Sequence, residues 1–474
     1  MEQETVLQQL DNLYSRQSST LSKQVRVEQT LRQAITQKWS SATRLPGHRA
    51  LAETLRISRH TLARAINTLI KEELLVTHHG KGTWSSYRAS AIAIPSETPV
   101  PRLSLRAQRV LRDPGAGMVQ NGSFVPGIPD ITKFPIRKWR QLYASVTVPQ
   151  NALLLSYSTG GYGPLKRAIR DFLQRWRRID CDIEQIIITD GTHNGIQLCA
   201  MALADAGDTV AMESPCYWGA RKVFTSSNLE LEMIPWAPGK GHLLPESPKP
   251  IQLAYLMGGH HYPLSVPTCI EDKRHLCQAL SPAYIIEDDY EFSQDDHINL
   301  LFDARSDRHI LASSFSKMIF PGLRLGYLVV PKHLASPINR LRSELFREGR
   351  MLDQAVLAQF MFNGDLDAWC QRIQREYLGR QQVVHDHLKT LPNVRYISPP
   401  SHAISLCIEF ESQIDDVVIA KSLLKEHLVV RPLSTVCSDT DQRSGLIMGV
   451  GMLSGDTLKH EVKRLISHLS VFLK

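Results

Sequence analysis

Long apolar runs are missing from this sequence. No stretch of about 18 residues, the length that a membrane-spanning helix requires, is apolar throughout. Residues 1–5 are acidic and polar, so the start of the chain does not have the composition of a secretory signal. We therefore expect a protein that has no membrane contact and is located in the cytoplasm.

Paired cysteines are missing too. The 8 cysteines are scattered without the close pairs of a zinc site, and the 18 histidines form no triad of ligands. Internal repeats are also absent. We expect reduced thiols, no disulfide framework and no metal centre.

What the sequence has is length and an uneven distribution of charge. At 474 residues, 43% of them hydrophobic and 22% charged, it is long enough for more than one globular domain. Residues 20–90 contain 12 lysines and arginines against 4 glutamates, a balance of +8, whereas the remaining residues contain 43 of each sign. A small basic module of this kind is typical of a nucleic-acid binder.

The pattern within residues 20–88 predicts a winged helix-turn-helix domain of the α+β class. Residues 45–55 are expected to form a short helix, and a second helix follows Ser58 with Leu62, Ile66 and Leu69 turned inward. Residues 74–86 then indicate a strand, a glycine-rich turn and a strand, which form a wing. The outward side chains of the second helix are Arg59, His60, Thr61, Arg64 and Asn67.

This order of elements resembles the winged helix of the GntR superfamily. The resemblance implies binding to a double-stranded DNA operator, with the second helix in the major groove. The residues predicted to contact DNA are Arg49, Ser58, Arg59, His60, Thr61 and Arg64, together with Gly80 and Lys81 in the wing.

Residues 89–120 are expected to link this module to the rest of the chain. Pro95, Pro99 and Pro101 disfavour both helix and sheet, so an extended, semi-rigid spacer is expected there. A brief helix is expected between residues 103 and 111.

A single lysine, Lys317, lies in an apolar stretch between Phe315 and Phe320. Partial desolvation lowers the pKa of such an amine and favours its nucleophilic form. Arg324 follows beyond a bend, and its planar guanidinium suits a phosphate. A lysine that binds an aldehyde and an arginine that binds a phosphate predict pyridoxal phosphate as the cofactor, with Lys317 as the Schiff-base lysine.

Residues 284–292 form a short apolar strand that ends in carboxylates, and ligand sites in α/β sheets lie at the carboxyl ends of strands. Asp288 can pair with a protonated pyridine nitrogen and keep the ring an electron sink. Tyr290 lies on the same side of an extended chain and can bind the ring hydroxyl. Glu287 and Asp289 would face elsewhere.

From residue 121 to residue 474 the chain resembles a fold-type-I aminotransferase, and the whole chain resembles the MocR-type regulators of the GntR superfamily. The resemblance implies a large α/β/α sandwich and a smaller α+β lobe that begins near residue 335. It also implies a phosphate contact in the turn before a helix that follows residues 185–189, where helix amides suit an anion. The predicted cofactor-binding residues are Gly191, Thr192, His193, Tyr217, which stacks on the ring, Asp288, Tyr290, Ser316, Lys317 and Arg324.

The sequence departs from the aminotransferase pattern near the substrate pocket. Residues 260–265 and 401–406 differ from two motifs of that family, so substrate chemistry is less firmly predicted than cofactor binding. Arg431 and Arg443 are alternative partners for the carboxylate of a substrate or effector.

These observations lead to one leading hypothesis and two alternatives. The leading hypothesis is a transcriptional regulator that senses pyridoxal phosphate or an amine adduct of it, with little or no turnover; the effector would be an amine, an amino acid or a B6 vitamer. The alternatives are a functional aminotransferase with an appended DNA-binding module and a regulator that no longer uses the cofactor. The resemblance also implies association with the nucleoid and a head-to-tail homodimer, in which Tyr157 or Tyr162 contributes to the neighbouring site.

Overall fold

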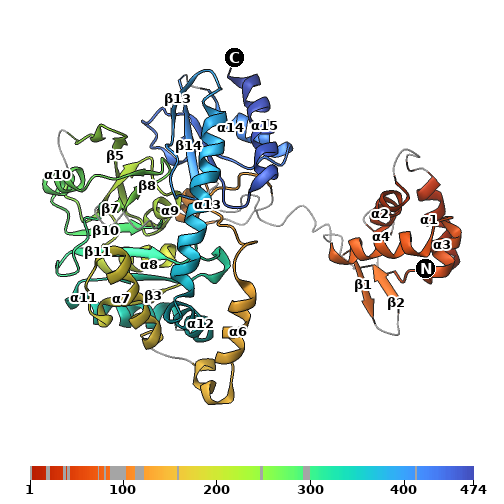
Figure 1. The fold of residues 1–474 in the computed structure, drawn as a ribbon, viewed down its shortest axis with the longest axis horizontal. Helices are drawn as coiled ribbons and strands as arrows, with labels where there is room; N and C mark the ends of the chain where they lie inside the picture. The colour runs from red at the N-terminus through yellow and green to blue at the C-terminus, as the bar shows by residue number, and fades with distance from the viewer. Residues whose placement is uncertain are drawn as a thin grey trace. The chain divides into compact units, whose positions relative to one another are not determined.

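The structure is a computed structural model. It describes residues 3–15, 17, 22–35, 39, 43–72, 74–78, 82–85, 103–112, 122–156, 160–245, 249–291, 299–347, 349–411 and 414–473. The chain divides into two compact units, residues 1–102 and residues 103–474 (Figure 1).

The described part of the first unit consists of helices and one two-stranded antiparallel sheet. Leu51 and Leu55 are buried together with Leu62, Ile66 and Leu69 in one apolar core. The inward positions predicted for the second helix are therefore confirmed. The elements are α1 (Gln3–Ser15), α2 (Lys23–Gln33), α3 (His48–Thr54), α4 (Arg59–Lys71), β1 (Leu75–His78) and β2 (Gly82–Ser85).

Helix α3 begins at His48 rather than at Leu45. Arg44 forms an antiparallel bridge with Trp84 of β2, and the Leu45 amide donates a hydrogen bond to the Thr83 carbonyl at 2.8 Å. These strand-like contacts extend the small sheet and hold the backbone out of the helix until after the Pro-Gly pair that follows.

Helix α1 was not predicted, although its apolar residues have helical spacing. Val6, Leu10 and Leu13 are buried in the core of the first unit. The Trp39 indole donates a hydrogen bond to the Gln9 side-chain oxygen at 3.2 Å. The winged helix is therefore extended at its N-terminal end by a helix that shares its core.

The large lobe of the second unit is built on a mixed sheet of eight strands in the order β3-β12-β11-β10-β7-β4-β5-β6. Strands β12 and β6 run antiparallel to their neighbours. Strands β3, β4, β7 and β12 are buried along their whole length, and β10 and β11 are buried after their first residue, as expected when helices cover both faces. The strands are β3 (Ile186–Thr189), β4 (Thr209–Ser214), β5 (Glu230–Ala237), β6 (Gly241–His242), β7 (Leu253–Met257), β10 (Tyr284–Asp289), β11 (His309–Ser314) and β12 (Gly326–Val329), and a separate pair is β8 (His260–His261) with β9 (Val266–Pro267).

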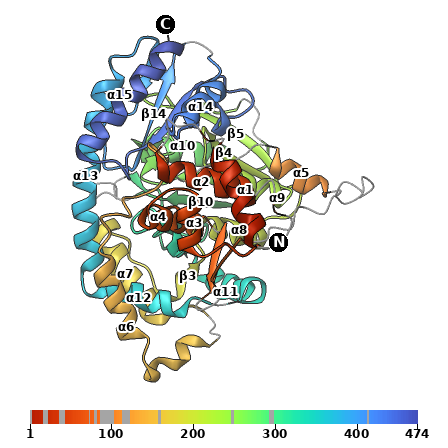
Figure 2. The same cartoon turned by 90° about the vertical axis from the view of Figure 1, so that its right-hand side faces the viewer.

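Helices cover both faces of this sheet, which confirms the predicted α/β/α sandwich (Figure 2). One face packs against α8 (Thr192–Leu203), α9 (Trp218–Ser226) and α11 (Lys332–Phe346). The other face packs against α6 (Ile136–Val146), α7 (Gly163–Arg177), α10 (Ile270–Leu280) and α12 (Met351–Phe362). Helix α5 (Leu105–Leu111), the brief helix expected in the linker, lies against α9. Short 3-10 helices are Pro149–Leu155, Ile183–Gln185, Pro321–Leu323 and Ser434–Val436.

The smaller lobe has an antiparallel sheet in the order β13-β14-β16-β15. It was expected to begin near residue 335, but the apolar side chains of α11 and α12 belong to the two cores of the large lobe. These two helices therefore extend the large lobe, and the chain crosses to the smaller lobe along α13. The elements are α13 (Asp365–Leu388), β13 (Val394–Ile397), β14 (Ser405–Phe410), α14 (Asp416–Lys425), β15 (Arg431–Pro432), β16 (Gly445–Gly449) and α15 (Gly455–Phe472).

Candidate functional site

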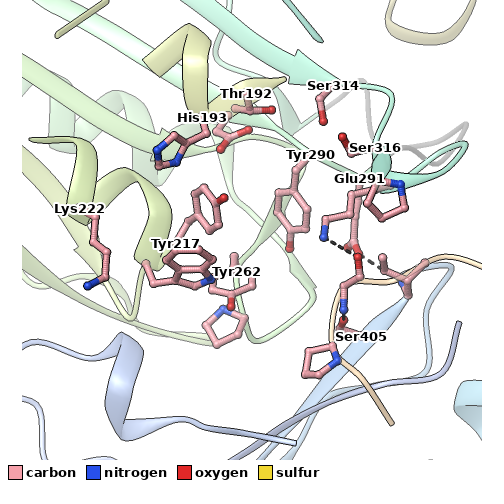
Figure 3. Close-up of a pocket in the computed structure, with 18 of the residues that line it drawn as sticks. Thr192, His193, Tyr217, Lys222, Tyr262, Tyr290, Glu291, Ser314, Ser316 and Ser405 are labelled. Carbon is pink, nitrogen blue, oxygen red and sulfur yellow. Dashed lines mark hydrogen bonds between the residues drawn. The ribbon is translucent and has the colours of Figure 1, made fainter. Parts of the chain in front are cut away.

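A pocket of about 660 Å³ lies at the carboxyl ends of the central strands, a volume typical of small-molecule sites. The segments that follow β3, β10 and β11 meet there, although they are far apart in the sequence. Figure 3 shows their side chains converging on one space. The sequence-predicted residues that line the pocket are Thr192, His193, Tyr217, Asp288, Tyr290, Ser316, Lys317, Arg324 and Arg431.

Lys317 lies in the turn after β11, and its amine donates a hydrogen bond to the Gly127 carbonyl at 2.6 Å. Burial lowers the pKa of Lys317 to about 8, with a smaller contribution in the same direction from Arg431 and opposition from Glu291 and Asp288. At neutral pH about one tenth of this amine is uncharged, more than a hundredfold above an ordinary lysine. The amine is therefore suited to attack an aldehyde.

Asp288 presents an unsatisfied oxygen. The Tyr255 hydroxyl donates a hydrogen bond to its Oδ2 at 2.5 Å, whereas Oδ1 is buried with no hydrogen-bond partner among the described residues. Burial raises the pKa of Asp288 to about 7, although the bond from Tyr255 and the charge of Lys317 lower it. A buried carboxylate oxygen of this kind fits a ligand group that carries a proton and a positive charge, such as a protonated ring nitrogen.

Gly191 and Arg324 frame a site for an anion. Gly191 caps α8 with a φ of 85°, a conformation that favours glycine. The guanidinium of Arg324 is 3.5 Å from the point that a Cβ on Gly191 would occupy, and it donates a hydrogen bond to the Asp190 carbonyl at 3.0 Å. The first residues of α8, Thr192 and His193, line the pocket. A helix N-terminus beside a guanidinium suits a phosphate.

Three tyrosines form an aromatic row in the pocket. The ring of Tyr262 is perpendicular to those of Tyr217 and Tyr290, with centroids 6.0 Å apart in each pair. Burial raises the pKa of Tyr262 to about 12 and raises the pKa values of the other two as well. All three are therefore neutral hydroxyl donors at neutral pH, and Tyr217 offers a ring surface to an aromatic ligand.

The carboxylates on either side of Asp288 turn away from the pocket, as the alternation of a strand predicts. Glu287 accepts a hydrogen bond from the buried Lys273 amine at 2.5 Å. Asp289 pairs with the Arg177 guanidinium at 2.8 Å. Both ion pairs fix β10 within the large lobe, and Asp288 is the carboxylate between them that lines the pocket.

The two arginines considered for a carboxylate have different surroundings. Arg431, in β15, lines the pocket, and its guanidinium carbon is 5.1 Å from the centre of the Trp218 ring. Arg443 pairs with the Asp441 carboxylate at 2.5 Å and donates to the Ser214 carbonyl at 2.8 Å. Arg443 is not among the residues that line this pocket. The geometry therefore favours Arg431.

Several lining residues were missed by the sequence analysis. Glu291 directly follows Tyr290 within residues 284–292, but no role was predicted for it. Lys222 lies on α9 and Gly127 lies before the large lobe, and neither carries a sequence signal. The segments that depart from the aminotransferase pattern supply Tyr262, Pro263, Ser265, Ile404 and Ser405.

The predicted DNA-reading side chains of α4 lie on its surface. Arg59, His60 and Arg64 are exposed, and Thr61 is half-buried. The hydroxyl oxygen of Ser58 accepts a hydrogen bond from the Thr61 amide at 3.0 Å, so Ser58 caps the helix. The helix thus presents a basic face from its first turn onward.

The remaining predicted DNA contacts differ in how the structure describes them. Arg49 is exposed on α3 and pairs with Glu53 at 3.0 Å. Strands β1 and β2 pair from Leu75 with Ser85 to His78 with Gly82, which confirms the wing strands. Gly80 and Lys81, at the tip, lie outside the described residues.

Two tyrosines were considered for a neighbouring site, and one of them, Tyr157, lies outside the described residues. Tyr162 is not among the residues that line the pocket, and its amide donates to the Gln354 side chain at 2.8 Å before α7. The described residues contain no cluster of three side chains that could hold a metal ion. Within the same residues, no helix has the length and apolar character needed to cross a membrane.

Two protein families match the chain. Residues 23–84 match the bacterial regulatory proteins of the gntR family. Residues 132–244 and 288–445, more than half of the chain, match aminotransferase class I and II. The second match includes Asp288, Lys317 and Arg324 of the pocket.

Relatives resemble the chain over most of their own length. A probable rhizopine catabolism regulatory protein, MocR, of Rhizobium meliloti is 28% identical over 438 residues, which are 90% of this chain and 89% of that protein. The HTH-type pyridoxine biosynthesis transcriptional regulator PdxR of Corynebacterium glutamicum is 28% identical over 433 residues, 88% of each chain.

The fold of the larger unit is that of solved aminotransferases. A multiple substrate aminotransferase from Thermococcus profundus matches with a TM-score of 0.65 and 18% identity, over 79% of this chain and 97% of that one. The α-aminoadipate aminotransferase LysN from Thermus thermophilus matches with a TM-score of 0.64 and 21% identity, over 78% and 95%. The predicted fold-type-I architecture is thereby confirmed.

Proposed function

We infer that this chain, which belongs to the aminotransferase class I and II family and also carries a gntR-family domain, is a transcriptional regulator. It binds an operator and responds to pyridoxal phosphate or an amine adduct of it. The observation that carries the proposal is the union, in one chain, of an exposed basic helix and the Lys317 pocket. Relatives named as regulators share both parts over most of their length.

Binding to DNA rests on the first unit. The gntR-family match covers α2 to β2, and the basic residues of α4 are exposed. Arg59 and Arg64 would read base edges in the major groove, while Lys81 would contact phosphates without regard to sequence. Arg49 would exchange its pair with Glu53 for a backbone phosphate, because that pair is exposed and weak.

Pyridoxal phosphate fits the charged groups of the pocket. Lys317 would hold the aldehyde carbon, and Asp288 would hold the ring nitrogen. Tyr217 would stack on the ring, and Tyr290 would bind the ring hydroxyl. The phosphate would be held by Gly191, Thr192, His193, Ser316 and Arg324. The strongest support is the buried oxygen Oδ1 of Asp288, which has no partner among the described residues. When bound, the cofactor supplies an electrophilic carbon to which amines add covalently.

The effector would be an amine, an amino acid or a B6 vitamer that reaches Lys317. Arg431 is the candidate for a carboxylate on the carbon that bears the effector's amine, because Arg431 lines the pocket and Arg443 is occupied by Asp441. Binding energy can shift the regulator between states only as far as the effector's affinities for those states differ.

We also propose a head-to-tail homodimer that works in the cytoplasm at the nucleoid. A dimer would present two α4 helices to two half-sites of an operator, as symmetric DNA-binding proteins do. Sedimentation of the holo-protein with and without a DNA duplex containing one or two half-sites tests this assembly.

A second candidate function is amino-group transfer. It is supported by the lowered pKa of Lys317 and by the match of the larger unit to the aminotransferase family. Two assays separate it from regulation: operator affinity with and without pyridoxal phosphate, and steady-state transamination with common amino donors. A change in operator affinity with negligible turnover supports the regulator, whereas turnover of about 1 per second or faster with unchanged affinity supports the enzyme.

A further inference from the structure

Helix α5 lies at the surface of the larger unit. It lies against α9, yet none of its residues is buried. Leu105 and Leu111, its largest apolar side chains, are 73% and 66% exposed. The packing of α5 on α9 removes little apolar surface from water, so the hydrophobic contribution to this packing is small. The polar contacts that α9 makes with α5, and with the C-terminal end of α5 in particular, therefore decide whether α5 stays docked.

Two such contacts lie among the described residues. The Lys222 amine, on α9, donates a hydrogen bond to the Val110 carbonyl. Carbonyls in the last turn of a helix have no partner within the helix, and a cation is favourable there. The Arg109 side chain also donates a long hydrogen bond, 3.5 Å, to the Asn228 side chain just after α9.

The Lys222 contact opens onto the same pocket as Lys317. Both Lys222 and Val110 line it. In Figure 3 Lys222 and Glu291 lie at opposite sides of the view, with Tyr217 and Tyr290 between them. Lys317 lines a smaller pocket together with Tyr290 and Glu291, so a ligand that is attached to Lys317 and extends past Tyr217 approaches the amine that holds α5.

We propose that Lys222 is an effector-binding residue: an acidic group, carried at the far end of the amine that joins the cofactor, binds Lys222 in place of the Val110 carbonyl and releases α5 from α9. A carboxylate or sulfonate is a stronger partner for an ammonium group than a neutral carbonyl is. Helix α5 is the first described element after the segment that joins the two units. Its release would thus change the tether of the DNA-binding unit, so this inference rests on the proposed function.

The experiment measures hydrogen exchange of residues 105–111 and operator affinity on the same full-length samples. The protein is loaded with pyridoxal phosphate alone, or together with β-alanine or its longer homologues, each matched with the alkylamine of equal length, beginning with propylamine. The variant is Lys222→Met, and the control is Lys459→Met on α15, an exposed lysine far along the chain. The visible absorbance of each sample is recorded first, so that only cofactor-bound protein is scored.

One of the ω-amino acids should speed exchange in α5 and change operator affinity at least about fivefold, the lower end of ordinary couplings. The matched alkylamine should do neither. In Lys222→Met α5 should exchange fast with every ligand, whereas Lys459→Met should behave as the parent protein. Equal responses of Lys222→Met and the parent protein, or unchanged α5 exchange with all ω-amino acids, would overturn the inference. If α5 responds as expected but operator affinity stays constant, the subsite stands and the regulatory function fails.

Discussion

Lys317 and Gly127 are 190 positions apart in the chain, yet the lysine amine donates a hydrogen bond to the Gly127 carbonyl at 2.6 Å. Gly127 has a φ of 72°, and a Cβ at this position would lie 2.5 Å from the amine nitrogen. The segment that enters the large lobe therefore forms one wall of the pocket. Only a glycine at position 127 leaves enough space for the Lys317 amine.

Gly127→Ala should weaken cofactor capture. The new methyl group would displace the Lys317 amine, and an alanine at positive φ costs about 1–2 kcal/mol of stability. The measurement is the yield of borohydride-trapped adduct, together with urea unfolding. The matched control is Gly379→Ala in α13, where a Cβ meets nothing within 4 Å; it should raise stability by up to about 1 kcal/mol and leave the adduct yield intact. Equal yields from both variants would refute the steric argument.

The rate at which Lys317 captures pyridoxal phosphate should depend on pH with a midpoint near 8. Burial lowers the pKa of Lys317 to about 8, so the reactive neutral amine increases about tenfold per pH unit below that value and levels off above it. Absorbance kinetics between about pH 6 and 10 measure this, with Nα-acetyl-lysine as the reference amine. A rate that keeps rising to pH 10 would show an ordinary lysine.

Asp288→Asn should stabilise the cofactor-free protein at high pH. Burial raises the pKa of Asp288 from 3.8 to about 7, so the native state holds this proton more tightly than the unfolded state. Stability from this group is therefore present below pH 4 and is lost as pH rises towards 7. Asparagine does not ionise, so the variant avoids this loss in the free energy of unfolding, which amounts to at most about 4 kcal/mol at pH 8. Urea unfolding at pH 5 and pH 8 tests the sign, and a variant less stable than its parent at pH 8 would contradict it.

Replacing Arg59 and Arg64 together with alanine should erase preference for the operator over random DNA. Each good bidentate base contact contributes about 1–3 kcal/mol of discrimination. The control removes the same charge from α2 through Lys23→Ala and Arg32→Ala, two positions outside the predicted DNA contacts, and the preference for the operator should persist in it. Fluorescence anisotropy with an operator duplex and a random duplex, at several salt concentrations, measures this preference. Full preference in the Arg59, Arg64 variant would mean that another element reads the sequence.

The sequence predicted most of the residues whose chemistry is local. Lys317 with Arg324 and Asp288 with Tyr290 lie within a few positions of each other, so residue type and local spacing predicted a common ligand for each pair. Helix α1 carried a readable signal as well, because Val6, Leu10 and Leu13 repeat at helical spacing.

Contacts between distant segments could not be predicted in this way. The choice between Arg431 and Arg443 depends in part on Ser214, whose carbonyl lies 229 positions from Arg443 and meets it only in the folded chain. The Lys222 amine meets Val110 across 112 positions. Helix α3 starts late because residues before it pair with β2, and no local propensity reports such a partner.

Operator affinity measured with and without pyridoxal phosphate, for the parent protein and for Lys317→Ala, tests the central claim most directly. The account predicts that the cofactor, or its adduct with an amine, changes the affinity of the parent protein at least about fivefold. It predicts that Lys317→Ala, which remains folded, binds the operator equally well under both conditions. Identical affinities of the parent protein with and without cofactor, under conditions where the adduct absorbs visible light, would contradict it.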